Sequence, residues 1–164
     1  AHTPRPLRPA RPTATRAPLL DALDTTHRRV LVTLAQLRQL AEDLDSEGLT
    51  DETRAKAASI CQFFDETARE HHAAEEREVF PALLASGDAV LVQHVQRLQQ
   101  DHGWLEQDWL ELQPHLRAVA EGLSGYDPDF LRSATTVFTD LYNEHIALEE
   151  EIVYPASQHL ADRG

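Results

Sequence analysis

Two stretches of the chain carry the residue types that can do chemistry, and they are near copies of each other. They run from Glu70 to Pro81 and from Glu144 to Pro155, and both read Glu-His, then Glu-Glu at the same offset, then an aromatic residue and Pro. Residues four apart lie on one face of an α-helix. Each copy therefore aims an imidazole and a carboxylate in one direction, which makes half of a metal site. The two pairs are His71 with Glu75 and His145 with Glu149.

Two further histidines occupy equivalent places earlier in each half of the chain. His27 precedes His71 by 44 residues, and His102 precedes His145 by 43. The chain therefore reads as two helical hairpins, each with one inward His on its first helix and a His-x-x-x-Glu pair on its second. A pseudo-two-fold axis between the hairpins would bring four His and two Glu to one level of a shared core.

The elements that must position these residues read as four helices. Apolar residues at helical spacing predict helices over about 18–44, 50–86 and 88–122, and a fourth helix that starts at Asp127-Pro128 and keeps the pattern to Ile152. Pro81 predicts a kink or an end in the second helix, and Pro114 predicts a kink in the third. We therefore predict an all-α, up-down-up-down four-helix bundle that forms one domain over residues 18–164. Residues 1–17, rich in Pro and Arg and without acid, are predicted to be a disordered tail.

The bulk composition limits the partners. The chain has 164 residues and a formal net charge of −13, which makes nucleic acid and anionic membrane poor partners. No apolar run approaches the roughly 20 residues that span a bilayer. The single cysteine, Cys61, rules out an intramolecular disulfide and favours a reducing, cytoplasmic location. The oligomeric state is left open.

Two glutamates lie in the predicted apolar core, where a bound metal would offset the repulsion between their charges. Glu75 and Glu149 share a helix face with apolar residues, and two carboxylates in such a core repel each other and take up protons. Two dications between them would remove the repulsion. Imidazole with carboxylate suits iron, manganese or zinc better than calcium or magnesium.

Taken together, these residues resemble the hemerythrin-like family, also called the HHE cation-binding domain. The resemblance runs from about residue 20 to 158 and includes the Phe80-Pro81 and Tyr154-Pro155 pairs that follow the glutamates. It implies a non-haem centre of two iron ions, with manganese as the alternative metal, bridged by oxo or hydroxo groups. Glu75 and Glu149 would be bridging carboxylates and the four histidines terminal ligands. It also implies reaction with dioxygen.

The third helix departs from the family pattern. Oxygen-carrying members have a second His four residues after the first on this helix, where the present chain has Glu106. A third carboxylate favours the oxidised metal, so the sequence leans towards an oxidase or oxygenase that uses dioxygen or peroxide on a small molecule. The alternatives are a protein that binds or senses dioxygen, nitric oxide or iron, and one that stores or detoxifies iron.

Four further residues complete the sequence-based assignment. Tyr142 lies one turn before His145 and is the candidate catalytic residue, as a hydrogen-bond donor to a bound oxygen species. His72 with Glu76 forms a rival His-x-x-x-Glu pair, rotated by about 100° from the first. The second copy has Ile146 in place of His72, so His71 and Glu75 are the preferred register. Glu76 and Glu150 are then expected on the outer face or behind the ligands.

Overall fold

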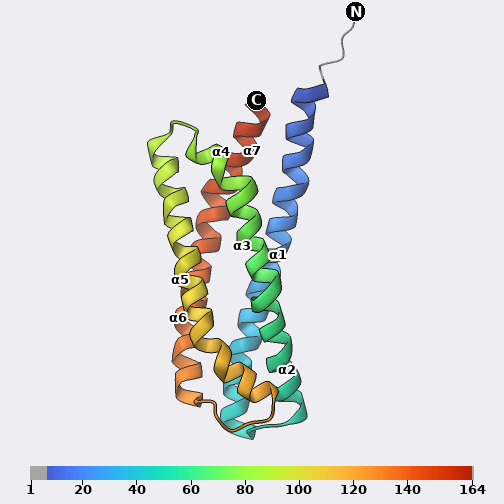
Figure 1. Cartoon of the computed structure of the whole chain (residues 1–164), viewed down its shortest axis with the longest axis vertical. Helices are drawn as coiled ribbons and strands as arrows, with labels where there is room; N and C mark the ends of the chain where they lie inside the picture. Colours follow the sequence, from blue (N-terminus) through green and yellow to red (C-terminus); the bar gives the residue numbers. More distant parts are fainter. Residues whose placement is uncertain (1–6, 164) are drawn as a thin grey trace, which may run out of the picture.

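The computed structural model describes residues 7–163, with side chains from Arg16 onward, and its described part is helical without a strand. Four helical columns run up, down, up and down, as predicted (Figure 1). The first column is α1 (Leu7–Glu47) and the third is α5 (Ala89–Ala120). The second column comprises α2 (Asp51–Gln62), the π turn η1 (Phe63–Thr67), α3 (Ala68–Ala74), the π turn η2 (Glu75–Val79) and α4 (Phe80–Leu84). The fourth column comprises α6 (Pro128–Leu148), the π turn η3 (Glu149–Val153) and α7 (Tyr154–Arg163).

The first column begins inside the segment that the sequence assigned to a tail. Residues 1–6 of that segment lie outside the described residues, and α1 is helical from Leu7. The first buried side chain on α1 is Leu20, close to the predicted start of the bundle at residue 18. No helix in the described range is long and apolar enough to cross a membrane.

Capping side chains fix where the columns begin. Thr50 accepts a hydrogen bond from the backbone N–H of Thr53, and the Thr53 hydroxyl in turn accepts one from the N–H of Thr50. Asp88 and Asp127 cap α5 and α6 in the same way, each through two backbone N–H groups of the first turn. These caps satisfy donors that have no partner inside a helix, so the second, third and fourth columns start where the sequence predicted.

Two prolines change the type of helix without ending it. Pro81 has no N–H to donate, and its ring clashes with the carbonyl one turn before. The helix accommodates it with a π turn, in which the N–H of Phe80 donates to the carbonyl of Glu75. Pro155 follows the same pattern, since the N–H of Tyr154 donates to the carbonyl of Glu149. The structure thus has a π turn where the sequence predicted a kink or an end at Pro81, and the turn begins at the glutamate in both copies.

The third column also carries an internal proline. Pro114 lies inside α5, which continues through it as one helix to Ala120. Figure 1 shows the lower part of this helix inclined to its upper part. Proline thus bends α5 as predicted and does not terminate it.

The core consists of two apolar clusters with a polar layer between them. The larger cluster includes Leu37, Phe64 and Phe138, and the smaller one includes Phe80 and Leu98. His27, Glu75, His102 and Glu149, one on each column, fall between the parts of their columns that belong to the two clusters. The fold therefore places those polar side chains across the middle of an otherwise apolar bundle.

Candidate metal centre

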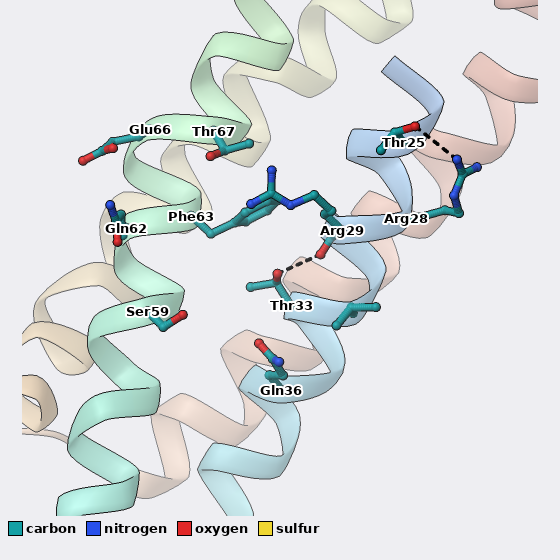
Figure 2. A pocket seen from close by; sticks show the side chains of 11 residues that line it. Thr25, Arg28, Arg29, Thr33, Gln36, Ser59, Gln62, Phe63, Glu66 and Thr67 are labelled. Carbon is teal, nitrogen blue, oxygen red and sulfur yellow. Dashed lines mark hydrogen bonds between the residues drawn. The ribbon is translucent and has the colours of Figure 1, made fainter. Parts of the chain in front are cut away.

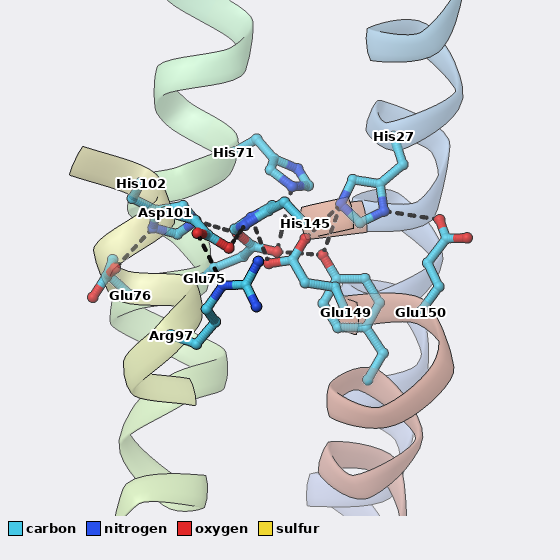
Figure 3. Close-up of polar contacts among 11 residues, drawn as sticks. His27, His71, Glu75, Glu76, Arg97, Asp101, His102, His145, Glu149 and Glu150 are labelled. Atoms are coloured by element: carbon cyan, nitrogen blue, oxygen red, sulfur yellow. Dashed lines mark hydrogen bonds and ion pairs between the residues drawn. The ribbon is translucent and has the colours of Figure 1, made fainter. Parts of the chain in front are cut away.

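The six symmetric ligand candidates meet in this polar layer (Figure 3). Their donor atoms form two overlapping groups, in each of which all atoms lie within 4.8 Å of one another. Both groups contain Glu75 and Glu149, so the two carboxylates lie between two adjacent candidate sites. The first group adds His27 and His71, and the second adds His102 and His145.

Contacts between the hairpins follow the predicted pseudo-symmetry. Nε2 of His27 lies 2.9 Å from Oε1 of Glu149. Nε2 of His102 lies 3.0 Å from Oε1 of Glu75. Each hairpin therefore supplies a histidine to the glutamate of the other, which ties the two halves together at the centre.

Contacts within each hairpin come from the four-residue spacing. Nε2 of His71 lies 3.4 Å from Oε2 of Glu75, and Nε2 of His145 lies 3.2 Å from Oε2 of Glu149. Both pairs point across one helix face, as the spacing predicted. All four side chains are buried, and the two glutamates are fully so.

Carboxylates behind the histidines orient their rings. Nδ1 of His27 donates to Glu150 over 2.8 Å, and Nδ1 of His102 donates to Glu76 over 2.8 Å. A proton held on Nδ1 leaves the lone pair of Nε2 free for a metal. Glu76 and Glu150 thus lie behind the ligands, in the second of the two places expected for them.

Asp101 plays the same part for His145 and was missed from the sequence. Its carboxylate lies 3.2 Å from Nδ1 of His145 and 3.3 Å from Nε of Arg97. The pair joins α5 to α6, so sequence spacing gave no sign of it. The equivalent place in the first half is Thr26, whose hydroxyl donates to a backbone carbonyl instead. Among the described residues His71 therefore has no carboxylate at Nδ1 to orient its ring, whereas His145 has Asp101.

The buried polar atoms test whether a cation fits. Both ring nitrogens of His71, Nε2 of His145 and Oε2 of Glu149 are buried and make no hydrogen bond within the described part of the chain. Such atoms cost roughly 1–3 kcal/mol each when they are left without a partner. They are nitrogen and oxygen donors that converge on one centre, which is what a bound cation requires. The residues present fit a metal.

The pKa values of the two glutamates shift in opposite directions when no cation is bound. Burial, and then the negative charge of Glu75, raise the pKa of Glu149 well above its usual value. Burial also raises the pKa of Glu75, but its close contacts with Glu149, His102 and His71 outweigh burial and hold the pKa well below the usual value. In metal-free protein Glu149 therefore holds a proton more tightly than Glu75 does, and a cation would compete with that proton.

The histidines of the centre differ in their affinity for protons. Burial, and then the neighbouring His71, lower the pKa of His27 to about 3, so its imidazole is neutral. Burial also lowers the pKa of His102, but its bonds to Glu75 and Glu76 outweigh burial and raise it. A metal at Glu75 must therefore compete with a proton on His102.

Two sequence-based assignments take different places from those expected. Glu106 is in none of the clusters of potential metal ligands within the described range; its side chain is 38% exposed and lies 3.6 Å from Arg69. His72, set aside in favour of His71, does join a cluster, with His102 and His145. Burial, and then His102, lower the pKa of His72 well below its usual value.

The tyrosine that contacts the centre is Tyr154. Its hydroxyl donates to Oε2 of Glu75 and lies 3.3 Å from Nε2 of His27, on whose ring it stacks. Tyr142, the candidate catalytic residue, is buried in the larger apolar cluster, and its ring centroid lies 6.1 Å from that of His72. Tyr154 is the aromatic residue that precedes the proline in the second copy of the repeated motif, and its bond to Glu75 gives that motif position a role.

A surface groove runs towards the centre between the first two columns. Its wider part, about 630 Å³, is lined by polar side chains and by Arg29, which lies over the ring of Phe63 (Figure 2). An adjoining pocket of about 450 Å³ shares Glu66 and Thr67 with it and reaches His71. A small molecule can therefore approach the centre from the His71 side.

The fold and the site define a four-helix-bundle protein that presents a His and carboxylate centre for a cation. The chain belongs to the family described as the hemerythrin HHE cation-binding domain, which matches residues 19–157. It is also 27% identical over 133 residues to an uncharacterized protein of Haemophilus influenzae (strain ATCC 51907 / DSM 11121 / KW20 / Rd), a match that covers 81% of this chain and 75% of the relative. No solved structure matches. The family agrees with the cation site that the donor atoms form.

Proposed function

We propose that this protein binds two iron ions in the polar layer and reacts there with dioxygen or peroxide. The observation that carries the proposal is the pair of overlapping donor groups that share Glu75 and Glu149. Two carboxylates shared by two sites are what a dinuclear centre needs, because each can bridge both ions. Mixed imidazole and carboxylate donors suit iron, with manganese as the alternative.

The residues of the chain have defined parts in this proposal. His27 and His71 would hold one ion, His102 and His145 the other, and the two glutamates would bridge them. The bound iron supplies one-electron chemistry towards dioxygen or peroxide. The carboxylates beside His27 and His102 accept a hydrogen bond from the ring proton at Nδ1, which directs the lone pair of each Nε2 towards an ion.

Oxidation of a small molecule is the reaction that we favour. It is supported by Tyr154, whose hydroxyl donates a hydrogen bond to Glu75. This hydroxyl is placed to transfer a proton beside the centre. The pocket that reaches His71 gives a small substrate a way in. The second candidate is reversible binding of dioxygen or nitric oxide. It is supported by Glu106, which pairs with Arg69 and is absent from the ligand clusters of the described range. Without this third carboxylate the ligand set has a larger share of imidazole.

Anaerobic loading with ferrous iron, followed by metal analysis and exposure to air, tests the proposal. We expect two iron ions per chain in the native protein and a loss of iron in Glu149→Gln. His159→Gln, which changes an exposed histidine, is the control and should keep both ions. Fewer than two ions per chain in the native protein would refute the dinuclear centre.

The spectrum after exposure to air separates the two candidate reactions. An oxygen-dependent absorption band that disappears when dioxygen is removed, and returns when it is restored, would overturn oxidation and support reversible binding. Rapid conversion to the ferric protein, with turnover that depends on an added reductant or substrate, would support oxidation.

A further inference from the structure

His72 lies at the edge of the metal centre, on α3 next to His71, and neither the repeat nor the proposed function gives it a role. We propose that His72 is a ligand of the ion held by His102 and His145, so that three imidazoles hold one ion and two hold the other. This inference rests on the proposed metal centre and assigns a residue of this chain to it.

The geometry that carries the inference is a triangle of imidazoles. One ring nitrogen from each of His72, His102 and His145 lies within 4.8 Å of the other two. The ring centroids of His72 and His102 are 4.1 Å apart, those of His102 and His145 are 4.9 Å apart, and those of His72 and His145 are 5.9 Å apart. Imidazole nitrogens lie about 2.0–2.1 Å from a bound dication, so two on one ion are at most roughly 4.2 Å apart. The separations of the three nitrogens therefore exceed this limit by at most about 0.6 Å.

The free nitrogens of His72 distinguish it from its two neighbours. His102 and His145 each hold a carboxylate at Nδ1, from Glu76 and Asp101. Neither ring nitrogen of His72 forms a hydrogen bond with another residue in the range whose side chains are described. His72 is half-buried beside the other two histidines, so its nitrogens are available to an ion held there.

The comparison between halves shows that this residue is not part of the repeat. The place of His72 in the second half is taken by Ile146, which is buried in the larger apolar cluster. Beside the ion of His27 and His71, an apolar side chain therefore occupies the place equivalent to that of His72. The two ions would then have unequal donor sets, with the shared glutamates common to both.

Replacement by phenylalanine separates ligation from packing. His72→Phe keeps an aromatic ring to stack on His102 but removes both nitrogens. We expect native protein loaded with iron-57 to give two Mössbauer doublets of equal area with different quadrupole splittings. In His72→Phe we expect one of the two ions to be bound at least about tenfold more weakly in competition with a chelator. Glu106→Gln is the matched control, and both ions should stay as tightly bound as in the native protein.

The outcomes separate this inference from the proposed function. Unchanged affinity for both ions in His72→Phe would overturn the ligand role and leave the dinuclear centre intact. A native protein that binds one ion would refute the dinuclear centre, and loss of that ion in His72→Phe would still support ligation by His72. Circular dichroism of the metal-free variant checks its fold. Should it fail to fold, ¹⁵N-histidine NMR of native protein decides, since zinc loading should shift a ring nitrogen of His72, and an unmoved resonance would overturn the inference.

Discussion

Replacing Glu149 by glutamine should change how the stability of the metal-free protein depends on pH. Glu149 is fully buried and faces Glu75, which raises the pKa of its carboxyl well above the usual 4.5. The unfolded chain has no such environment, so its Glu149 loses a proton near pH 4.5. Above that pH the folded state holds one more proton than the unfolded state, and stability therefore falls as the pH rises.

The size of the effect follows from one proton. A difference of one bound proton changes the free energy of unfolding by about 1.4 kcal/mol per pH unit. From pH 5 to pH 6 native protein should therefore lose about 1 kcal/mol more than Glu149→Gln does. Glutamine resembles the protonated acid in shape and can still donate a hydrogen bond to Glu75, so the packing of the variant should be preserved. The loss should stop once the pH exceeds the pKa of Glu149 in the folded protein.

Urea unfolding followed by circular dichroism, at several pH values and with a chelator present, measures this difference. Glu151→Gln makes the same replacement at an exposed residue two positions along and is the control. It should follow the native pH dependence. Parallel curves for native protein and Glu149→Gln would refute the reasoning, because Glu149 would then carry no excess proton in the folded state.

Three further substitutions probe other parts of the structure. Asp101→Asn weakens the hold on His145 and should lower iron affinity about 10- to 100-fold in chelator competition, whereas the exposed Asp140→Asn should not; equal affinities would show that Asp101 does not support the ligand. Tyr154→Phe keeps the ring but removes the hydrogen-bond donor to Glu75, so the iron content should be unchanged and the reaction with dioxygen, followed by stopped-flow absorption, should be at least about tenfold slower. An unchanged rate would show that the phenol takes no part in the reaction. Leu37→Ala empties a fully buried position and should cost about 2–5 kcal/mol in urea unfolding with iron stoichiometry unaffected, so a loss below about 1 kcal/mol would contradict the assigned core.

Most of the fold and the symmetric part of the site could be predicted from local sequence patterns. Caps such as Thr50 and Asp127 and the spacing of apolar residues are properties of short segments, so the helices could be predicted without knowledge of the tertiary structure. The four-residue spacing of His71 and Glu75 likewise fixes a shared helix face. Pro81 could not be assigned from sequence alone, because proline is compatible with a break, a kink or a π turn, and packing on both sides of it decides between them.

The chain by itself determined an all-α bundle with two matched His and Glu pairs, because helical periodicity and an internal repeat are written in sequence order. Only the tertiary structure decided what lies behind and beside those pairs. It placed Asp101 on His145, Tyr154 on Glu75 and Glu106 on Arg69, and it brought His72 to the centre. Each of these contacts joins different helical columns or depends on the rotation of a helix about its axis. A rotation of one residue, about 100°, moves a side chain between the core and the surface, and only the packing of all four columns fixes that rotation.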